Sequence, residues 1–514
     1  MLISSGIGEN RQRTLAVVLF CVIAMAGAGV YALRAPVVTG GDAAAYCLAA
    51  RYDPLTDNFD NPSHGWGYPM LVKWVGRVAG DEYRAARCIS ILACGAFVAM
   101  AVMLAFQYLP KAHAWVCAAL VATQPVVWQM GGTAMSDMTF AAMAGAVIYM
   151  LSMEEPGLFS VGAAGVLATY AVLIRGNGMV LLPVAAAVLW MNSGGKFQRL
   201  IVFLSAAALC FGAAAILFKV DGAPLKLLLR SGAGELAFAT LDKTDTWLHR
   251  AEYEAQYPAY GALLAEHWRD LLRTAVKTIF HVYDWWLLPL LLVFGFWTFP
   301  GLLMSYRRPR GAWRRLVLPS LVLLATYLWS GRFQDMRHLL PVLPCLAILS
   351  VLGMQLIPRH VRIGAKRRVP WGRGAVLLLA LLISLGAAGH EFLQTVRAGT
   401  NSQADIDQSD AGKWLRQNGT PPTDRVALTR LTVAYYGHVK PVDFSQVFGA
   451  PAGSLTPDEV VRLLRNKQCQ WLVWIKGHSE NSYPGLKWLE NDPSLPGSEL
   501  VFSTDNVRLW RISP

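Results

Sequence analysis

Long uncharged apolar runs recur along most of the chain, and they constrain its fold more than any other feature. A helix that crosses a bilayer needs about 20 mostly apolar residues. Runs of this kind predict about eleven transmembrane helices, at 15–33, 88–109, 114–135, 138–153, 157–174, 177–192, 200–218, 285–306, 316–331, 339–357 and 375–389. We therefore expect a polytopic α-helical membrane protein.

The low content of charged residues supports this class and argues against a soluble, nucleic-acid-binding protein. The 514-residue chain is 54% hydrophobic and 15% charged, whereas soluble globular proteins carry about 25% charged residues. The formal net charge of +13 would suggest nucleic acid binding in a soluble protein. Membrane proteins concentrate Lys and Arg in cytoplasmic loops instead, so we expect no nucleic acid partner.

Lys and Arg collect in alternate loops, which predicts the orientation of the chain in the membrane. Basic residues lie before the first run, at Arg11 and Arg13, and fill the loops at 307–315 and 359–373. The short loops on the opposite side carry few of them. By the positive-inside rule the N-terminus is cytoplasmic. An odd number of spans then puts the C-terminus outside.

The predicted spans divide the chain into a membrane module, residues 1–391, and a tail, residues 392–514. The module has two long outer loops, 34–87 and 219–284, and the stretch 68–75 in the first suits a helix lying in the membrane interface. The tail is expected to be an extracytoplasmic α/β domain. It contains a predicted helix at 410–417, strands at 425–429 and 471–475, a capping box at Thr456 and Glu459 that opens a helix to 466, and a hairpin over 499–512.

Asp42 is the most specific ionisable residue at the expected outer face, directly after the first span. Ionisable residues near a membrane are costly and often functional. A carboxylate there can act as a general base or a cation ligand. Asp is also a favoured N-cap, here for a helix over 43–50. The two roles are compatible.

Three further residues on this side have both a functional and a structural interpretation. Asp137 either caps the fourth span or faces the same cavity as Asp42. Arg175 either belongs to a simple turn or contacts an anion. His64 either contacts a ligand anion or is an ordinary loop histidine at the headgroup level.

Arg332, Arg337 and His338 open the tenth span on a side that has few positive charges. One interpretation is anchoring to lipid headgroups. The other is recognition of a phosphate, which Arg performs well through bidentate hydrogen bonds.

Several signatures of other functions do not occur in the sequence. It has no Walker A loop, Gly-x-Ser-x-Gly elbow, His-Glu-x-x-His or Cys-x-x-Cys motif. Ionisable residues are also nearly absent from the centres of the predicted spans, where ion-coupled transporters usually keep some. This absence weakens the interpretation as a flippase or other transporter, which remains an alternative beside a non-catalytic assembly or anchoring protein.

The chain resembles the GT-C class of integral-membrane glycosyltransferases, in particular bacterial relatives of protein O-mannosyltransferases and of the lipid A aminoarabinose transferase. Four features carry the resemblance: Gly41-Asp42 with Tyr46, Gly67-Tyr68-Pro69, Ser136-Asp137, and the segment Arg337-His338-Leu-Leu-Pro-Val-Leu-Pro. It implies a multi-pass protein of the bacterial inner membrane with a periplasmic active site.

The resemblance also implies an activity and roles for residues. Such enzymes transfer a sugar from a polyprenyl phosphate to a lipid, glycan or protein acceptor on the outer face. Asp42 matches the acidic residue that activates the acceptor or meets a metal, so a divalent cation is a candidate cofactor. Arg337 matches the residue that holds the donor phosphate. The expected substrate-binding set is Arg337, His338, Arg332, Arg175, Asp137, His64 and Tyr46.

Overall fold

A computed structural model describes most of the chain. It describes residues 3–513 except 39, 52–65, 154, 192–194, 218–240, 242–255, 257–259, 286–295, 307–315, 323, 325–335, 356–360, 364–366, 370–371, 399–400, 449–454, 478, 480–482 and 492–493. The expected site residues His64 and Arg332 lie outside the described residues.

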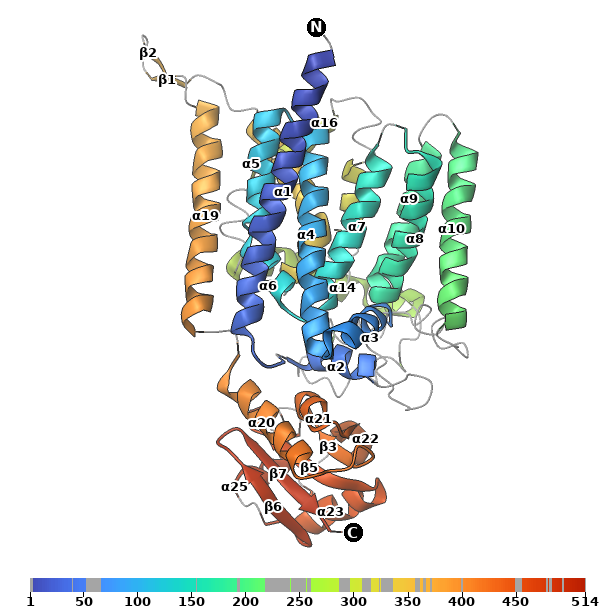
Figure 1. Ribbon diagram of the computed structural model, residues 1–514, viewed down its shortest axis with the longest axis vertical. Helices are drawn as coiled ribbons and strands as arrows, with labels where there is room; N and C mark the ends of the chain where they lie inside the picture. The colour runs from blue at the N-terminus through green and yellow to red at the C-terminus, as the bar shows by residue number, and fades with distance from the viewer. Residues whose placement is uncertain are drawn as a thin grey trace. The chain divides into compact units, whose positions relative to one another are not determined.

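Helices dominate the first four fifths of the chain (Figure 1). They are α1 (Ile3–Arg34), α2 (Gly40–Arg51), α3 (Gly67–Ala79), α4 (Glu82–Tyr108), α5 (Lys111–Ala122), α6 (Pro125–Gly132), α7 (Ser136–Ser152), α8 (Leu158–Ile174), η1 (Gly176–Val180), α9 (Leu181–Met191), α10 (Lys196–Leu217), α14 (Tyr260–Trp285), α16 (Phe296–Tyr306), η4 (Met336–Val342), α18 (Leu343–Met354) and α19 (Gly372–Ala398). A short hairpin, β1 (Val361–Ile363) with β2 (Arg367–Val369), precedes α19.

Several of these helices are long and apolar enough to cross a membrane. Within the described residues there are five such segments: Asn10–Arg34, Glu82–Tyr108, Lys196–Ile216, Arg337–Met354 and Leu377–Arg397. The pair α6 and α7, bent by 117°, makes a sixth if it counts as one span. The expectation of a multi-pass helical membrane protein is therefore confirmed. The number of about eleven spans stays a prediction, since the spans expected at 285–306 and 316–331 lie partly outside the described residues.

The chain forms two compact units. A helical unit comprises Met1–Leu33, Asp53–Leu229 and Leu271–Ala398, and an α/β unit comprises Arg34–Tyr52, Arg230–Asp270 and Gly399–Pro514. The α/β unit thus includes α2, the helix that carries Asp42.

Within the helical unit, α4 packs against α3, α5 and α7, while α8 packs against α7 and α10. The amphipathic helix α3 lies across the ends of the long helices (Figure 1). It begins where the predicted interfacial helix begins, at Gly67-Tyr68-Pro69. Gly67 is required there because a Cβ at this position would lie 2.9 Å from the backbone nitrogen of Ile174. This glycine lets α3 contact the last residues of α8.

The α/β unit is built on a five-stranded sheet of order β4-β3-β5-β7-β6. Its elements are α20 (Gln403–Gln417), β3 (Arg425–Leu428), α21 (Thr432–Gly437), β4 (Lys440–Asp443), α22 (Phe444–Phe448), α23 (Pro457–Asn466), β5 (Cys469–Ile475), η5 (Pro484–Leu486), α25 (Trp488–Asn491), β6 (Ser498–Ser503) and β7 (Val507–Ile512). Strand β3 is parallel to β4 and β5, and β7 is antiparallel to β5 and β6. The core joins the sheet to α22 and α23 through Leu472, Trp474, Trp510, Phe444 and Val460.

Local signals in the sequence predicted most of these tail elements. The capping box at Thr456 forms with Glu459, and the helix it opens ends at Asn466. The hairpin over 499–512 forms as β6 and β7. The helix expected at 410–417 is longer, because a second capping box, Ser402 with Asp405, starts it at Gln403. Strand β4 and helix α21 were not expected.

Helix α2 is docked on α21 within the α/β unit. The Arg51 Nη1 donates a hydrogen bond to the carbonyl oxygen of Tyr435 at 2.7 Å, and its guanidinium lies 4.5 Å from the centroid of the Tyr435 ring. The segment before α2 is held as well, since the Val38 N–H donates to the Tyr436 hydroxyl at 3.0 Å. The residues that follow the first helix therefore belong to the same body as the end of the chain.

Candidate functional site

In the helical unit, the start of α7 and the end of α8 bring Asp137 and Arg175 together. The two helices follow one another along the chain and pack together, so the first turn of α7 lies beside the last turn of α8. There the Arg175 Nη1 donates a hydrogen bond to Oδ1 of Asp137, and the two form a salt bridge. The side chains are 3% exposed for Asp137 and 17% for Arg175. The structure therefore brings together two residues that the sequence analysis considered separately.

Each charge suits its helix end. The peptide dipoles give a helix a partial positive charge at its N-terminus and a partial negative charge at its C-terminus. Asp137 lies in the first turn of α7 and Arg175 is the C-cap residue of α8. The N-cap residue of α7 is Met135, which makes no side-chain cap hydrogen bond. The interpretation of Asp137 as a capping residue is therefore wrong: its carboxylate binds Arg175.

Hydrogen bonds join the Gly-Tyr-Pro segment to α4 and α8. The Tyr68 hydroxyl donates to the Ala86 carbonyl oxygen at 3.1 Å and shares a hydrogen bond with the Ser90 hydroxyl at 3.2 Å. The Ser90 hydroxyl lies 3.3 Å from the carbonyl oxygen of Met135, the residue before α7. The Tyr170 hydroxyl donates to the Gly67 carbonyl oxygen at 2.8 Å. These contacts hold α3 and α4 against the helix ends that carry the ion pair.

The Arg337 and His338 pair begins a third element of this region, η4, which packs against α7. Pro341 lies inside η4, and Pro344 stands at the start of α18. Proline lacks a backbone N–H and favours the first turn of a helix, which explains why regular α-helix begins only at Leu343. Arg337 is half-buried and His338 is 6% exposed. His338 is therefore a buried residue, so the interpretation as a headgroup anchor does not hold for it.

Asp42 and Tyr46 lie on α2 in the α/β unit. Helix α2 begins at Gly40, so Asp42 lies within its first turn and the structure does not give it the N-cap position. Asp42 is half-buried and Tyr46 is buried. Their spacing of one helical turn puts both on one face of α2. A carboxylate in the first turn is stabilised in its charged, proton-accepting form by the helix dipole.

Arg51 is a contributor to this region that the sequence did not single out. It anchors the last turn of α2 on α21 through the contacts with Tyr435 described above, and so positions the helix that carries Asp42. A lone arginine at the end of a short alanine-rich helix carries little sequence signal. Its partner is 384 residues away in the chain, a distance no local pattern reaches.

The described residues do not make a metal site of their own. No group of three or more His, Cys, Asp or Glu side chains gathers within the part of the chain that the structure covers. Asp42 is followed by Ala43, and one oxygen of Asp137 is committed to Arg175. The divalent cation that the resemblance implies therefore stays a prediction.

Comparisons with solved structures identify the fold. The chain is similar over 98% of its length to an Archaeoglobus fulgidus oligosaccharyltransferase crystallised with a tethered acceptor peptide, at 14% identity and a TM-score of 0.60, covering 74% of that chain. It is similar to ArnT from Cupriavidus metallidurans bound to undecaprenyl phosphate over 97% of both chains, at 12% identity and a TM-score of 0.59. The mycobacterial arabinofuranosyltransferase AftD matches at 13% identity and a TM-score of 0.51, over 98% of this chain and 42% of that one.

These three proteins are GT-C glycosyltransferases, and the expected resemblance to that class is confirmed at the level of the fold. Another structure of the archaeal oligosaccharyltransferase, named AglB, holds dolichol-phosphate and an inhibitory peptide, with 14% identity and a TM-score of 0.55. No family model and no curated protein sequence matches the chain.

Proposed function

We propose that this protein, a multi-pass membrane protein with the GT-C fold, is a glycosyltransferase that uses a sugar linked to a polyprenyl phosphate. The observation that carries the proposal is the likeness over nearly the whole chain to transferases solved with undecaprenyl phosphate and dolichol-phosphate. Arginine and histidine side chains at the helix ends of the helical unit suit the same ligand, because a phosphate is recognised well by guanidinium groups.

The reaction proposed is a single displacement. The hydroxyl or amine of the acceptor attacks the anomeric carbon and forms the new glycosidic bond, while the bond from that carbon to the phosphate oxygen breaks. The proton of the acceptor passes to the Asp42 carboxylate, and the polyprenyl phosphate leaves with the electron pair. Attack from the opposite face inverts the anomeric centre. The leaving phosphate is already ionised, so stabilising its charge matters more than protonating it.

The remaining residues have supporting roles in this proposal. Arg337, with His338, binds the departing phosphate, and Arg332 and His64 are proposed as further contacts of the donor. Arg175 binds the donor phosphate from the end of α8 with Asp137 as its positioning partner. Tyr46, one turn after Asp42, contacts the acceptor or the sugar. The acceptor is a lipid, a glycan or a protein.

The proposed location is the bacterial inner membrane, with the N-terminus cytoplasmic and the active site on the periplasmic side. The docking of α2 on α21 supports an odd number of spans. Helix α2 follows the first span directly, and its contact with α21 supports placing the end of the chain on the same side of the membrane as the loop after that span.

The decisive experiment compares three strains: wild type, a deletion of the gene, and the deletion carrying an Asp42→Asn copy expressed at equal level. Glycolipids, surface glycans and protein glycans are profiled in each by mass spectrometry. We expect one glycoform to be missing in both the deletion and the Asp42→Asn strain, and its mass identifies the sugar and the acceptor. An Asp42→Asn copy that restores the wild-type profile would refute the general base and favour a flippase or a non-catalytic protein.

A further inference from the structure

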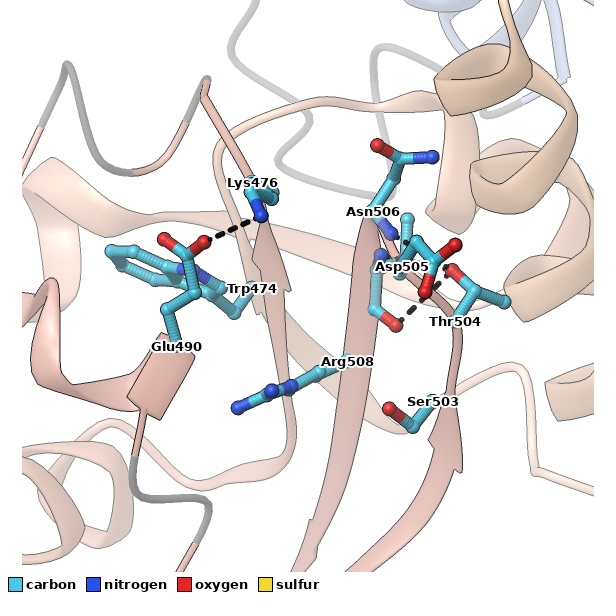
Figure 2. Close-up of a pocket in the computed structure, with 9 residues that line it drawn as sticks. Trp474, Lys476, Glu490, Ser503, Thr504, Asp505, Asn506 and Arg508 are labelled. Atoms are coloured by element: carbon cyan, nitrogen blue, oxygen red, sulfur yellow. Dashed lines mark hydrogen bonds and ion pairs between the residues drawn. The ribbon is translucent and has the colours of Figure 1, made fainter.

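A polar cleft of about 470 Å³ opens at one end of the sheet in the α/β unit (Figure 2). It lies between α25 and the ends of β5, β7 and β6, where the hairpin turns at Thr504–Asn506. Trp474 of β5 stands directly opposite Arg508 of β7, and Ser503 of β6 stands opposite Arg508 on its other side. Residues in such a cross-strand row lie on one face of a sheet. The three side chains therefore share the sheet face that holds the core.

Arg508 is an unusual residue for this position. Two residues further along β7 the same face carries Trp510, which is fully buried in the core. Arginine is seldom placed on such a face unless it has a partner or a ligand. The Arg508 Nη1 donates to the Leu489 carbonyl oxygen at 2.8 Å, which fixes the guanidinium against α25. Figure 2 shows the guanidinium extending between the two sides of the cleft.

The α25 side of the cleft also carries an ion pair. The Lys476 Nζ lies 2.9 Å from Oε1 of Glu490, so this lysine and this carboxylate neutralise each other. Asp505 at the hairpin turn balances the charge of Arg508, and the four charged residues of the lining sum to zero. Such a balance disfavours a strongly anionic or cationic ligand.

Two buried polar atoms of the lining have unused hydrogen-bonding capacity. Trp474 is 1% exposed, yet its indole N–H has no hydrogen-bond partner among the described residues. Oε2 of Glu490 is buried and likewise has no partner there. Buried polar groups are nearly always hydrogen-bonded, so an unpartnered donor and an unpartnered acceptor in the lining of one cleft point to a ligand that supplies both.

The ligand chemistry follows from this lining. Each sugar hydroxyl donates one hydrogen bond and accepts others, and the cleft offers donors on Trp474 and Arg508 and acceptors on Glu490 and Asp505. Its volume lies within the range of about 300–1,000 Å³ usual for small-molecule sites. A polyprenyl or acyl chain would leave these polar groups without partners. A neutral saccharide satisfies them.

We infer that this cleft is a saccharide-binding site, separate from the residues proposed for sugar transfer, and that it holds the glycan part of the acceptor or of the product. Saccharide binding itself does not depend on the proposed transferase activity, whereas the assignment to acceptor or product rests on it. The site gives the α/β unit a role in capturing the molecule to be modified.

The test uses the full-length protein in phosphatidylcholine nanodiscs and saturation-transfer NMR. The neutral probes are glucose, galactose, mannose, N-acetylglucosamine, arabinose and maltose, and the anionic probes are glucuronate and inorganic phosphate. We expect at least one neutral saccharide to bind. Arg508→Ala, Glu490→Gln and Trp474→Phe, which removes only the indole N–H and part of the ring, are each expected to weaken that binding by about tenfold.

The matched control is Arg511→Ala, which removes an exposed arginine from the same strand, outside the cleft lining, and should bind the saccharide as wild type does. Circular dichroism checks the fold of each variant, and Glu490→Gln decides the outcome if Arg508→Ala does not fold. Asp42→Asn should abolish transfer and leave this binding unchanged, which separates a failure of the cleft from a failure of the transferase proposal. The inference is overturned if no neutral probe binds, if only the anionic probes bind, or if the cleft variants bind as tightly as wild type.

Discussion

The carboxylate of Asp137 and the guanidinium of Arg175 form an ion pair between the first turn of α7 and the C-cap position of α8. The pair is largely buried, and it sits where four sequence segments meet: α7, α8, the Gly-Tyr-Pro start of α3 and the adjoining turns of α4. The two charges at this end of the helical unit are therefore held in position by each other, without a ligand.

Breaking this pair from one side should destabilise the protein. Arg175→Ala leaves the Asp137 carboxylate buried and uncompensated, and removing one member of a buried pair costs about 3–5 kcal/mol. We expect a clear fall in the thermal unfolding midpoint in detergent for Arg175→Ala and Asp137→Ala, and a smaller loss in the double variant than the sum of the two. The control is Lys413→Ala, which removes an exposed ion pair with Asp410 and should change the unfolding midpoint little. Strictly additive losses would contradict the coupling.

Gly67→Ala should separate α3 from α8. The new Cβ would lie 2.9 Å from backbone atoms of Leu173 and Ile174, closer than packing allows, and overpacking of this kind costs about 1–3 kcal/mol. The measurement is the unfolding midpoint of the purified protein. Gly76→Ala in the same helix is the matched control, because its nearest contact is an ordinary 3.7 Å. It should keep or slightly raise stability, since alanine favours helix over glycine by about 1 kcal/mol.

Arg51→Ala should loosen α2 from α21. The substitution removes the hydrogen bond to the Tyr435 carbonyl and the stacking on its ring, together worth about 1–3 kcal/mol. Amide hydrogen exchange over residues 40–51 should become faster, and transfer activity should fall because Asp42 is less well held. Arg416→Ala, which removes only an exposed contact with His438, should leave both unchanged. Unaltered exchange in Arg51→Ala would mean that α2 is held by other contacts.

Arg337→Gln should weaken use of the donor more than Arg337→Lys does. Glutamine removes the positive charge expected to meet the phosphate, whereas lysine keeps the charge and loses the bidentate geometry. In a reconstituted assay, the loss of one charged hydrogen bond corresponds to about 1.5–3 kcal/mol in kcat/KM. Raising the donor concentration should partly rescue Arg337→Lys. Full activity of Arg337→Gln would remove this residue from the phosphate site.

Asp407 should make the α/β unit sensitive to acid. Burial raises the pKa of this carboxyl, but hydrogen bonds from Asn506, Gln403 and Thr504 outweigh burial and hold it below the ordinary value of 3.8. A group whose pKa is lowered in the folded state contributes stability above its unfolded pKa, and this contribution is lost as the pH falls through the folded pKa. We therefore expect the thermal unfolding midpoint of the wild-type protein to decrease when the pH is lowered below about 4.

Asp407→Asn should remove that part of the pH dependence and destabilise the unit at neutral pH by about 1–3 kcal/mol, because the new amide cannot accept all three hydrogen bonds. The control is Asp410→Asn on the same helix. Asp410 is exposed and is paired with Lys413 in an exposed ion pair. Identical acid sensitivity in wild type and Asp407→Asn would rule out Asp407 as the cause.

The sequence by itself determined the class of the protein and the elements that local forces specify. Apolar length predicted a multi-pass helical protein, because the bilayer leaves few other folds for such runs. The Thr456–Glu459 capping box and the terminal hairpin followed from hydrogen bonds and alternation within a few residues. The resemblance to GT-C enzymes rested on short segments, and the fold bears it out.

Only the tertiary structure decided which of the singled-out residues meet. Asp137 and Arg175 are 38 residues apart, and Arg51 and Tyr435 are 384 apart. The saccharide cleft needs Trp474, Glu490 and Arg508 from three different elements. Local patterns report on forces that act within a turn or a strand pair, whereas such contacts depend on how helices and sheet pack. For that reason a charged residue that looks like a cap in the sequence, as Asp137 does, becomes one half of a buried ion pair in the folded protein.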